Sequence, residues 1–382
     1  MGNAWLRALL WSLAIAAVLA GGLVMILVGR VAKHMLSSEP PLSARAPARD
    51  QSLLPKLPEV LHGTVLFAES DLIAIDLPTL KESKAWKRSG RPNLHSIAGP
   101  DKKGRVAMIV NDMMGERHWL TIRDLKSGSE TKLFDRKGDA LWGDIPTGME
   151  YVSETLAFSP DTGQIALGVD MSSFQIHNPD ALVHQGPLEI WDLASEKLRR
   201  LNVNIADCGF SWFPDGQHLA VVELVPPSAA QPVSTKGDKF MESFRSANVI
   251  PMISILDTAT GKRIQIHQGW RPVVSDDGRT ILASDYEFHL RLIDVATMSS
   301  RPVSLPGFYG TAIMVIGSEA AIYVAEQPPG EERLTEHNSP LVGPKDMPRI
   351  AFAKFNASAA QPVVGYVDPR WQVCFGKGRT QK

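Results

Sequence analysis

An uncharged apolar stretch runs from Ala8 to Gly29 and differs from everything that follows it. A helix of that length, at about 1.5 Å per residue, crosses the ~30 Å hydrocarbon core of a bilayer. The alternative is a cleavable signal peptide, whose apolar region is usually about 7 to 15 residues long. Its nearest small-x-small site, Ala44-Arg45-Ala46, lies far downstream. The pattern therefore predicts an N-terminal transmembrane signal anchor over residues 1–35.

Residues 36–60 carry five prolines and show neither helical nor alternating apolar spacing, which is typical of a semi-extended tether. Two arguments about the side of the membrane on which the body lies disagree. Counting the positive charges that flank the apolar stretch places the body in the cytoplasm, yet long domains translocate largely regardless of charge. We expect a single-pass protein of a bacterial inner membrane with its body in the periplasm.

After the tether, a short pattern recurs: apolar, any, apolar, any, Asp, any, any, Ser or Thr. Period-two apolar spacing indicates a strand with one buried face, and an Asp three residues before Ser or Thr caps the backbone amides of a turn. Five copies carry the pairs Asp76 and Thr79, Asp124 and Ser127, Asp192 and Ser195, Asp257 and Thr260, and Asp294 and Thr297, and a degraded sixth runs from Phe352 to Ala359.

A second motif precedes the first in most units and predicts a hairpin. It starts at Pro100-Asp101, Pro160-Asp161, Pro214-Asp215 and Asp276-Asp277, and each copy contains a Gly. We expect that Gly to supply the positive φ of the turn between strands such as 155–158 and 165–169. The two motifs together give four antiparallel strands per unit.

About six such units, with little helix between them, predict an all-β fold, a β-propeller over residues 61–376 with a tail at 377–382. A β-sandwich fits the spacing less well. The first unit supplies only three strands, 63–69, 72–77 and 84–88. We expect residues 371–375 to add the innermost strand of that blade and so to close the ring.

The Phe-Ser-Pro-Asp-x-Gly and Asp-x-x-Thr-Gly elements resemble the WD-like repeats of TolB-type bacterial propellers, over roughly residues 60 to 375. The Trp191-Asp192 pair is similar to that of WD repeats proper, but the Gly-His dipeptides of that family are absent. The resemblance implies a six-bladed fold and carries little about function, because such propellers serve unrelated roles.

Composition changes this picture little. The chain has 382 residues, is 44% hydrophobic and 21% charged, and has a formal net charge of −1, which gives no electrostatic case for nucleic acid as a partner. Its two cysteines, Cys208 and Cys374, are too few for a disulfide scaffold or a zinc site. They belong to strands predicted on opposite sides of the ring, so we expect no bridge between them.

Long insertions gather where antiparallel topology places them on one face. Residues 170–187, 225–248 and 326–348 fall between second and third strands, and residues 138–151 link the second and third units. Aromatic and Arg side chains anchor interfaces more often than other types, although such residues also pack within their own loops. The candidate partner-binding residues are therefore Trp142, Tyr151, Phe174, His177, His184, Lys239, Phe240, Phe244, Arg245, Arg333 and His337.

No nucleophile elbow, zinc-protease pair, P-loop or dinucleotide fingerprint occurs, and the ten histidines show no ligand spacing. We therefore predict no catalytic residue, cofactor or metal. The first hypothesis is a membrane-anchored protein-interaction or scaffold module of the bacterial envelope. One alternative is a propeller enzyme, such as a metal-dependent lactonase or other hydrolase, with acidic residues at the central channel. Another is a receptor for a small molecule or an envelope glycan.

Overall fold

The computed structural model describes residues 61–68, 72–77, 79, 81–86, 93–111, 117–137, 151–172, 185–206, 209–227, 248–285, 289–326, 349–366 and 372–377. All belong to one compact unit, residues 50–334 with 343–382. The predicted anchor and tether lie outside these ranges. No helix within the ranges is long and apolar enough to cross a membrane.

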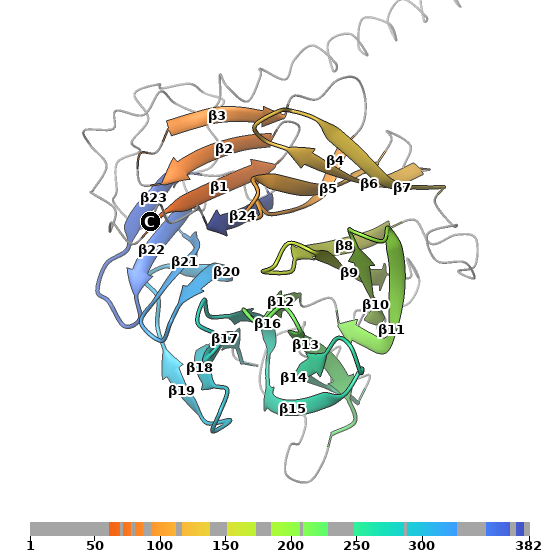
Figure 1. Ribbon diagram of the computed structural model, residues 1–382. Coiled ribbons are helices and arrows are strands. Elements are labelled where there is room, and N and C mark those ends of the chain that lie inside the picture. The colour runs from red at the N-terminus through yellow and green to blue at the C-terminus, as the bar shows by residue number, and fades with distance from the viewer. Residues whose placement is uncertain are drawn as a thin grey trace, which may run out of the picture. The chain divides into compact units, whose positions relative to one another are not determined.

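The described residues form six antiparallel sheets of four strands each (Figure 1). Blade 1 consists of β24 (Gln372–Lys377), β1 (Gly63–Ala68), β2 (Leu72–Leu77) and β3 (Lys81–Trp86). Blade 2 consists of β4 (Asn93–Ala98), β5 (Arg105–Asn111), β6 (Arg117–Asp124) and β7 (Glu130–Lys137). Blade 3 consists of β8 (Tyr151–Phe158), β9 (Gln164–Ser172), β10 (Gln185–Asp192) and β11 (Lys197–Ala206).

The second half of the chain repeats this order. Blade 4 consists of β12 (Phe210–Trp212), β13 (His218–Val225), β14 (Ile250–Asp257) and β15 (Arg263–Gln268). Blade 5 consists of β16 (Trp270–Val274), β17 (Thr280–Ser284), β18 (Leu290–Asp294) and β19 (Ser300–Val303). Blade 6 consists of β20 (Phe308–Ile316), β21 (Ala320–Ala325), β22 (Arg349–Lys354) and β23 (Gln361–Tyr366).

The last strand of the chain closes the ring. β24 pairs antiparallel with β1, from Gly63 opposite Lys377 to Ala68 opposite Gln372, so blade 1 combines both ends of the propeller. Contacts between innermost strands then run in a cycle, β24 to β4, β8, β12, β16, β20 and back to β24. The predicted donor strand and the six-bladed propeller of four-stranded blades are both confirmed.

The core consists of apolar layers between neighbouring blades. In β13, Leu219 and Val221 belong to a cluster with blade 3, whereas Ala220 and Val222 belong to a cluster with blade 5. All four side chains are fully buried. Because successive side chains of a strand point to opposite faces, a central strand buried on both sides carries a continuous apolar run, such as Leu219 to Val222, whereas outer strands do not.

The outermost strand of blade 1 corrects one predicted boundary. β3 begins at Lys81, where the alternation predicted a start at Lys84. Lys81 and Ser83 are exposed, whereas Ala85 and Trp86 at the other end of the strand are buried. A strand with one edge and much of its surface in water carries a weak apolar period, which is why its start was missed.

Candidate functional site

Two opposite faces of the propeller differ in how they are built. The turns between first and second strands and between third and fourth strands meet on one face, which we call the turn face. In five blades a backbone N–H just after the third strand donates to a carbonyl of the first turn. These bonds are Leu125 to Gly104, Leu193 to Gly163, Thr258 to Gln217, Val295 to Arg279 and Phe355 to Glu319, at 2.8–3.0 Å.

The recurring aspartates cap turns on this face. Asp124 accepts bonds from the N–H groups of Lys126 (2.9 Å) and Ser127 (2.7 Å) and from the Ser127 hydroxyl (3.0 Å). Asp192 and Asp294 accept the same two bonds from the Ser or Thr three residues later, at 2.7–2.8 Å. Hydrogen bonding, led by the Ser127 N–H, lowers the pKa of Asp124 below its ordinary 3.8. These carboxylates are therefore ionised and occupied by their own turns, as predicted.

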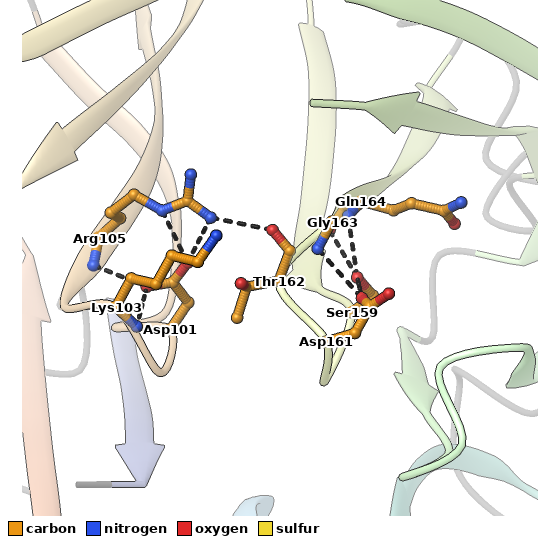
Figure 2. Close-up of polar contacts among 8 residues, drawn as sticks. All are labelled: Asp101, Lys103, Arg105, Ser159, Asp161, Thr162, Gly163 and Gln164. Carbon is orange, nitrogen blue, oxygen red and sulfur yellow. Dashed lines mark hydrogen bonds and ion pairs between the residues drawn. The ribbon is translucent and has the colours of Figure 1, made fainter. Parts of the chain in front are cut away.

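The turns also join neighbouring blades, and Figure 2 shows the joint between blades 2 and 3. The Asp101 side chain is completely buried and lies 2.7 Å from Nη2 of Arg105. The same nitrogen donates to the Thr162 carbonyl oxygen of blade 3 at 2.9 Å. The Arg105 guanidinium also lies over the Phe158 ring, 5.9 Å from its centroid. One arginine, held by Asp101 of its own blade, thus ties blade 2 to blade 3 through two contacts.

Similar joints follow around the ring. A Cβ added to Gly278 of blade 5 would lie 2.9 Å from Cδ of Pro214 in blade 4, so these turns pack directly together. Between blades 5 and 6, the Gly317 N–H donates to Asp276 at 2.7 Å, and the Thr280 hydroxyl donates to the Gly317 carbonyl at 2.9 Å. Direct contacts between turns therefore join blade 2 to blade 3 and join blades 4, 5 and 6 in series.

One turn departs from the expected chemistry. The predicted glycines have positive φ in blades 2, 4 and 5, at Gly104, Gly216 and Gly278, but in blade 3 Thr162 takes this conformation, with φ 65°, and Gly163 does not. The prediction that Gly supplies the turn was wrong there. As in blades 4 and 5, the left-handed residue directly follows the aspartate. The place in the turn, and not the residue type, therefore determines which residue has a positive φ. The cost for a non-glycine residue is about 1–2 kcal/mol, and Thr162 is held in place by Arg105.

The opposite surface, the loop face, consists of the connections between second and third strands and the links between blades. From the strand bounds, the long connections are residues 173–184, 226–249 and 326–348, and the link before blade 3 is 138–150. Every insertion noted in the sequence therefore leaves the propeller from this face.

The predicted partner-binding residues follow these connections. Tyr151 is the first residue of β8, at the loop-face end of an innermost strand, and its Cα lies opposite that of Ser172. The remaining ten lie outside the described residues: Trp142, Phe174, His177, His184, Lys239, Phe240, Phe244, Arg245, Arg333 and His337. Cys208 lies outside them as well, so the predicted absence of a bridge to Cys374 stays a prediction.

Two further loop-face residues, Arg271 and Tyr309, were not among the residues predicted from the sequence. They sit at the loop-face ends of the contacting innermost strands β16 and β20. Arg271 is exposed, has a positive φ of 52°, and lies where a bulge breaks the register of β16 with β17. Tyr309 is 51% exposed, among the most exposed large hydrophobic side chains described. Neither lies in an insertion, and only the preceding glycines, Gly269 and Gly307, mark these blade starts.

An exposed Arg and an exposed Tyr on the contacting innermost strands of neighbouring blades match the residue types that dominate interface energetics. Among the residues that the structure describes, no three His, Cys, Asp or Glu side chains come together as a metal site.

No family model matches the chain. No curated protein matches it. Among solved structures it is similar to TolB from Acinetobacter baumannii, with 12% identity, a TM-score of 0.49, and coverage of 82% of this chain and 67% of that one. It is also similar to a chain of the nidogen/laminin complex (9% identity, TM-score 0.48, coverage 82% and 97%) and to an oligogalacturonate lyase in complex with manganese (13%, 0.44, 67% and 68%). Likenesses this distant carry no functional argument. The TolB-like six-bladed propeller is confirmed at the level of the fold, by the sheet order and the ring closure.

Proposed function

We propose that this protein is a membrane-anchored β-propeller of the bacterial envelope that binds a protein partner through its loop face. The observation that carries the proposal is the asymmetry between the two faces. Short capped turns bonded from blade to blade form the turn face. Every long connection leaves from the other face. Rigid scaffolds present recognition on such loops.

The innermost strands supply fixed anchors beside these loops. Arg271 and Tyr309 directly follow Trp270 and Phe308, which pair with Ser284 and Ala325, so each lies one residue from a position fixed by the sheet. Pre-positioned aromatic and Arg side chains lose little entropy on binding and tend to be interface hot spots. Proteins of this kind bind through a few such anchors, with the loops excluding water around them.

The sequence supports the membrane attachment that we propose. The apolar stretch from Ala8 to Gly29 is long enough to span a bilayer, and the proline-rich segment 36–60 holds the body away from it. We place the body in the periplasm of a single-pass inner-membrane protein, near partners that share the membrane or its surface.

Removing one long connection tests the proposal. A chain in which residues 228–247 are replaced by a short Gly-Ser linker is expected to keep its melting temperature, because β13 and β14 remain paired through eight residues on each side. Its capture of a partner by chemical crosslinking in intact membranes should fall at least about tenfold, since a hot spot contributes 2 kcal/mol or more.

The matched control changes the turn face instead. Met298 is 46% exposed at a turn and Tyr309 is 51% exposed on the loop face, so the two offer similar apolar areas. Met298→Ala should leave capture unchanged, whereas Tyr309→Ala should lower it. Equal capture by the full chain and by the chain lacking the 228–247 connection would overturn the loop-face proposal.

A further inference from the structure

A polar groove of about 630 Å³ lies on the rim of the propeller between blades 3 and 4. One wall is β11, with Asn202 and Val203, and the other wall is β15, with Arg263 and Gln265. The floor is the end of β13, from Glu223 to Val225, where the connection 226–249 begins. Small-molecule sites usually fall in the range of about 300–1,000 Å³, so the groove has the size of a ligand site.

Glu223 breaks the pattern of its strand. Leu219 and Val221 point toward blade 3 from the same face of β13 and are fully buried in the core between the two blades. Glu223 is the next residue on that face and is only 7% exposed. Packing there calls for an apolar side chain, because a buried carboxylate carries a desolvation cost.

Arg263 compensates the charge of Glu223, since its Nη1 lies 2.5 Å from Oε1 of the carboxylate. The Glu223 carboxylate is largely buried while Arg263 is about half exposed. A pair that contains a desolvated carboxylate is often no more stable than an apolar pair of the same volume, so folding alone does not account for it. A role in binding a ligand would explain why an ion pair lies at the floor of the groove.

A second pair, in blade 3, differs in its carboxylate, because the Glu189 side chain is more deeply buried even though that of Arg200 is 53% exposed. Glu189 lies 3.0 Å from Nε of Arg200, and its side chain is 1% exposed, with Oε2 sealed from solvent. The side chains of Glu223 and Arg263 are 10% and 44% exposed, and both line the groove. The Glu223 carboxylate is thus the more exposed of the two, and this blade 4 pair can present charged atoms of both partners to a ligand in the groove.

The lining decides what class of ligand fits. The charges of Glu223 and Arg263 cancel, and the amides of Asn202 and Gln265 each offer a donor and an acceptor. A cation or an anion would have to take one partner of the pair and leave the other uncompensated, which is unfavourable because Glu223 is largely buried. A hydroxyl group both donates and accepts, so a ligand with several hydroxyls can donate to Glu223 and accept from Arg263 while the pair stays intact. We propose that this groove binds a neutral polyhydroxylated ligand of the sugar class.

Saturation-transfer NMR on the full chain in a detergent without a sugar headgroup tests the proposal, with glucose, galactose, N-acetylglucosamine and trehalose as probes. At least one probe should give a saturable signal. Glu223→Gln and Arg263→Gln should weaken its binding more than tenfold, because each removes a charge-assisted hydrogen bond. Gln265→Ala leaves the ion pair in place and should weaken binding about threefold to tenfold, as expected for a neutral hydrogen bond.

Glu130→Gln is the matched control, because it alters an ion pair of similar length, 2.6 Å to Arg123, on blade 2. It should leave binding unchanged. The proposal is overturned if none of the four probes binds, if all variants bind equally well, or if glucuronate or glucosamine outcompetes the neutral sugars. Partner capture through the loop face is measured separately, so either proposal can fail without the other.

Discussion

A chain that lacks residues 370–382 is expected to be unfolded at temperatures at which the full chain is folded. The deletion removes β24, whose six residues pair with β1 and which contacts the innermost strands β4 and β20. Without it, β1 exposes a hydrogen-bonding edge toward the centre, and two blade interfaces lose a member. Because the net stability of a domain is only about 5–15 kcal/mol, loss of one innermost strand should exceed it.

Circular dichroism melts of purified proteins measure this effect. The control chain lacks only residues 378–382 and keeps all of β24, so its melting temperature should match that of the full chain. A chain without residues 370–382 that melts at the temperature of the control would mean that ring closure through β24 does not stabilise the propeller.

Asp101→Ala is expected to lower the free energy of unfolding by about 3 kcal/mol, the usual cost of leaving one partner of a buried ion pair alone. Asp101 also accepts bonds from the N–H groups of Lys103 (2.9 Å) and Arg105 (2.8 Å), so its loss opens the turn as well as the joint to blade 3. The Arg105 side chain, 22% exposed, would keep its charge without a carboxylate beside it.

Asp215→Ala provides the comparison, because Asp215 caps the equivalent turn of blade 4 at 2.8 Å but has a side chain that is 47% exposed. Losing an exposed cap costs about 1 kcal/mol. Urea denaturation of the two variants measures the difference. Equal losses would show that the buried pair of Asp101 and Arg105 adds nothing beyond turn capping.

Most of the fold could be predicted from the sequence, because each propeller blade repeats the same two sequence patterns. A strand of alternating or continuous apolar residues, such as β13, and an aspartate at a fixed distance from Ser or Thr, such as Asp124, report burial and turn capping locally. Ring closure was predictable from blade 1, since β1, β2 and β3 left one strand missing.

What the sequence could not show depends on contacts between distant residues. The sequence around Thr162 does not show the contact that supports its left-handed conformation, because Arg105 donates to it from another blade. The outer strand β3 starts in exposed polar residues, so its period is hidden. Glu223 and Arg263 are 40 residues apart, and only the pairing of blade 4 brings them together.

The sequence likewise predicted one part of the candidate site and missed another. The loop face was predictable, because insertions at fixed places between strands are visible as excess length. Arg271 and Tyr309 were not, since they follow links of ordinary length and are distinguished only by exposure and by the bulge in β16.

Photo-crosslinking from the two faces of the propeller decides whether a partner binds where the long connections are. A photoreactive amino acid is placed at position 309, on the loop face, or at position 298, on the turn face, which have nearly equal exposure. In intact membranes we expect a discrete crosslinked product from position 309 and none from position 298. The opposite pattern, or the same product from both positions, would contradict the assignment of the loop face as the binding surface.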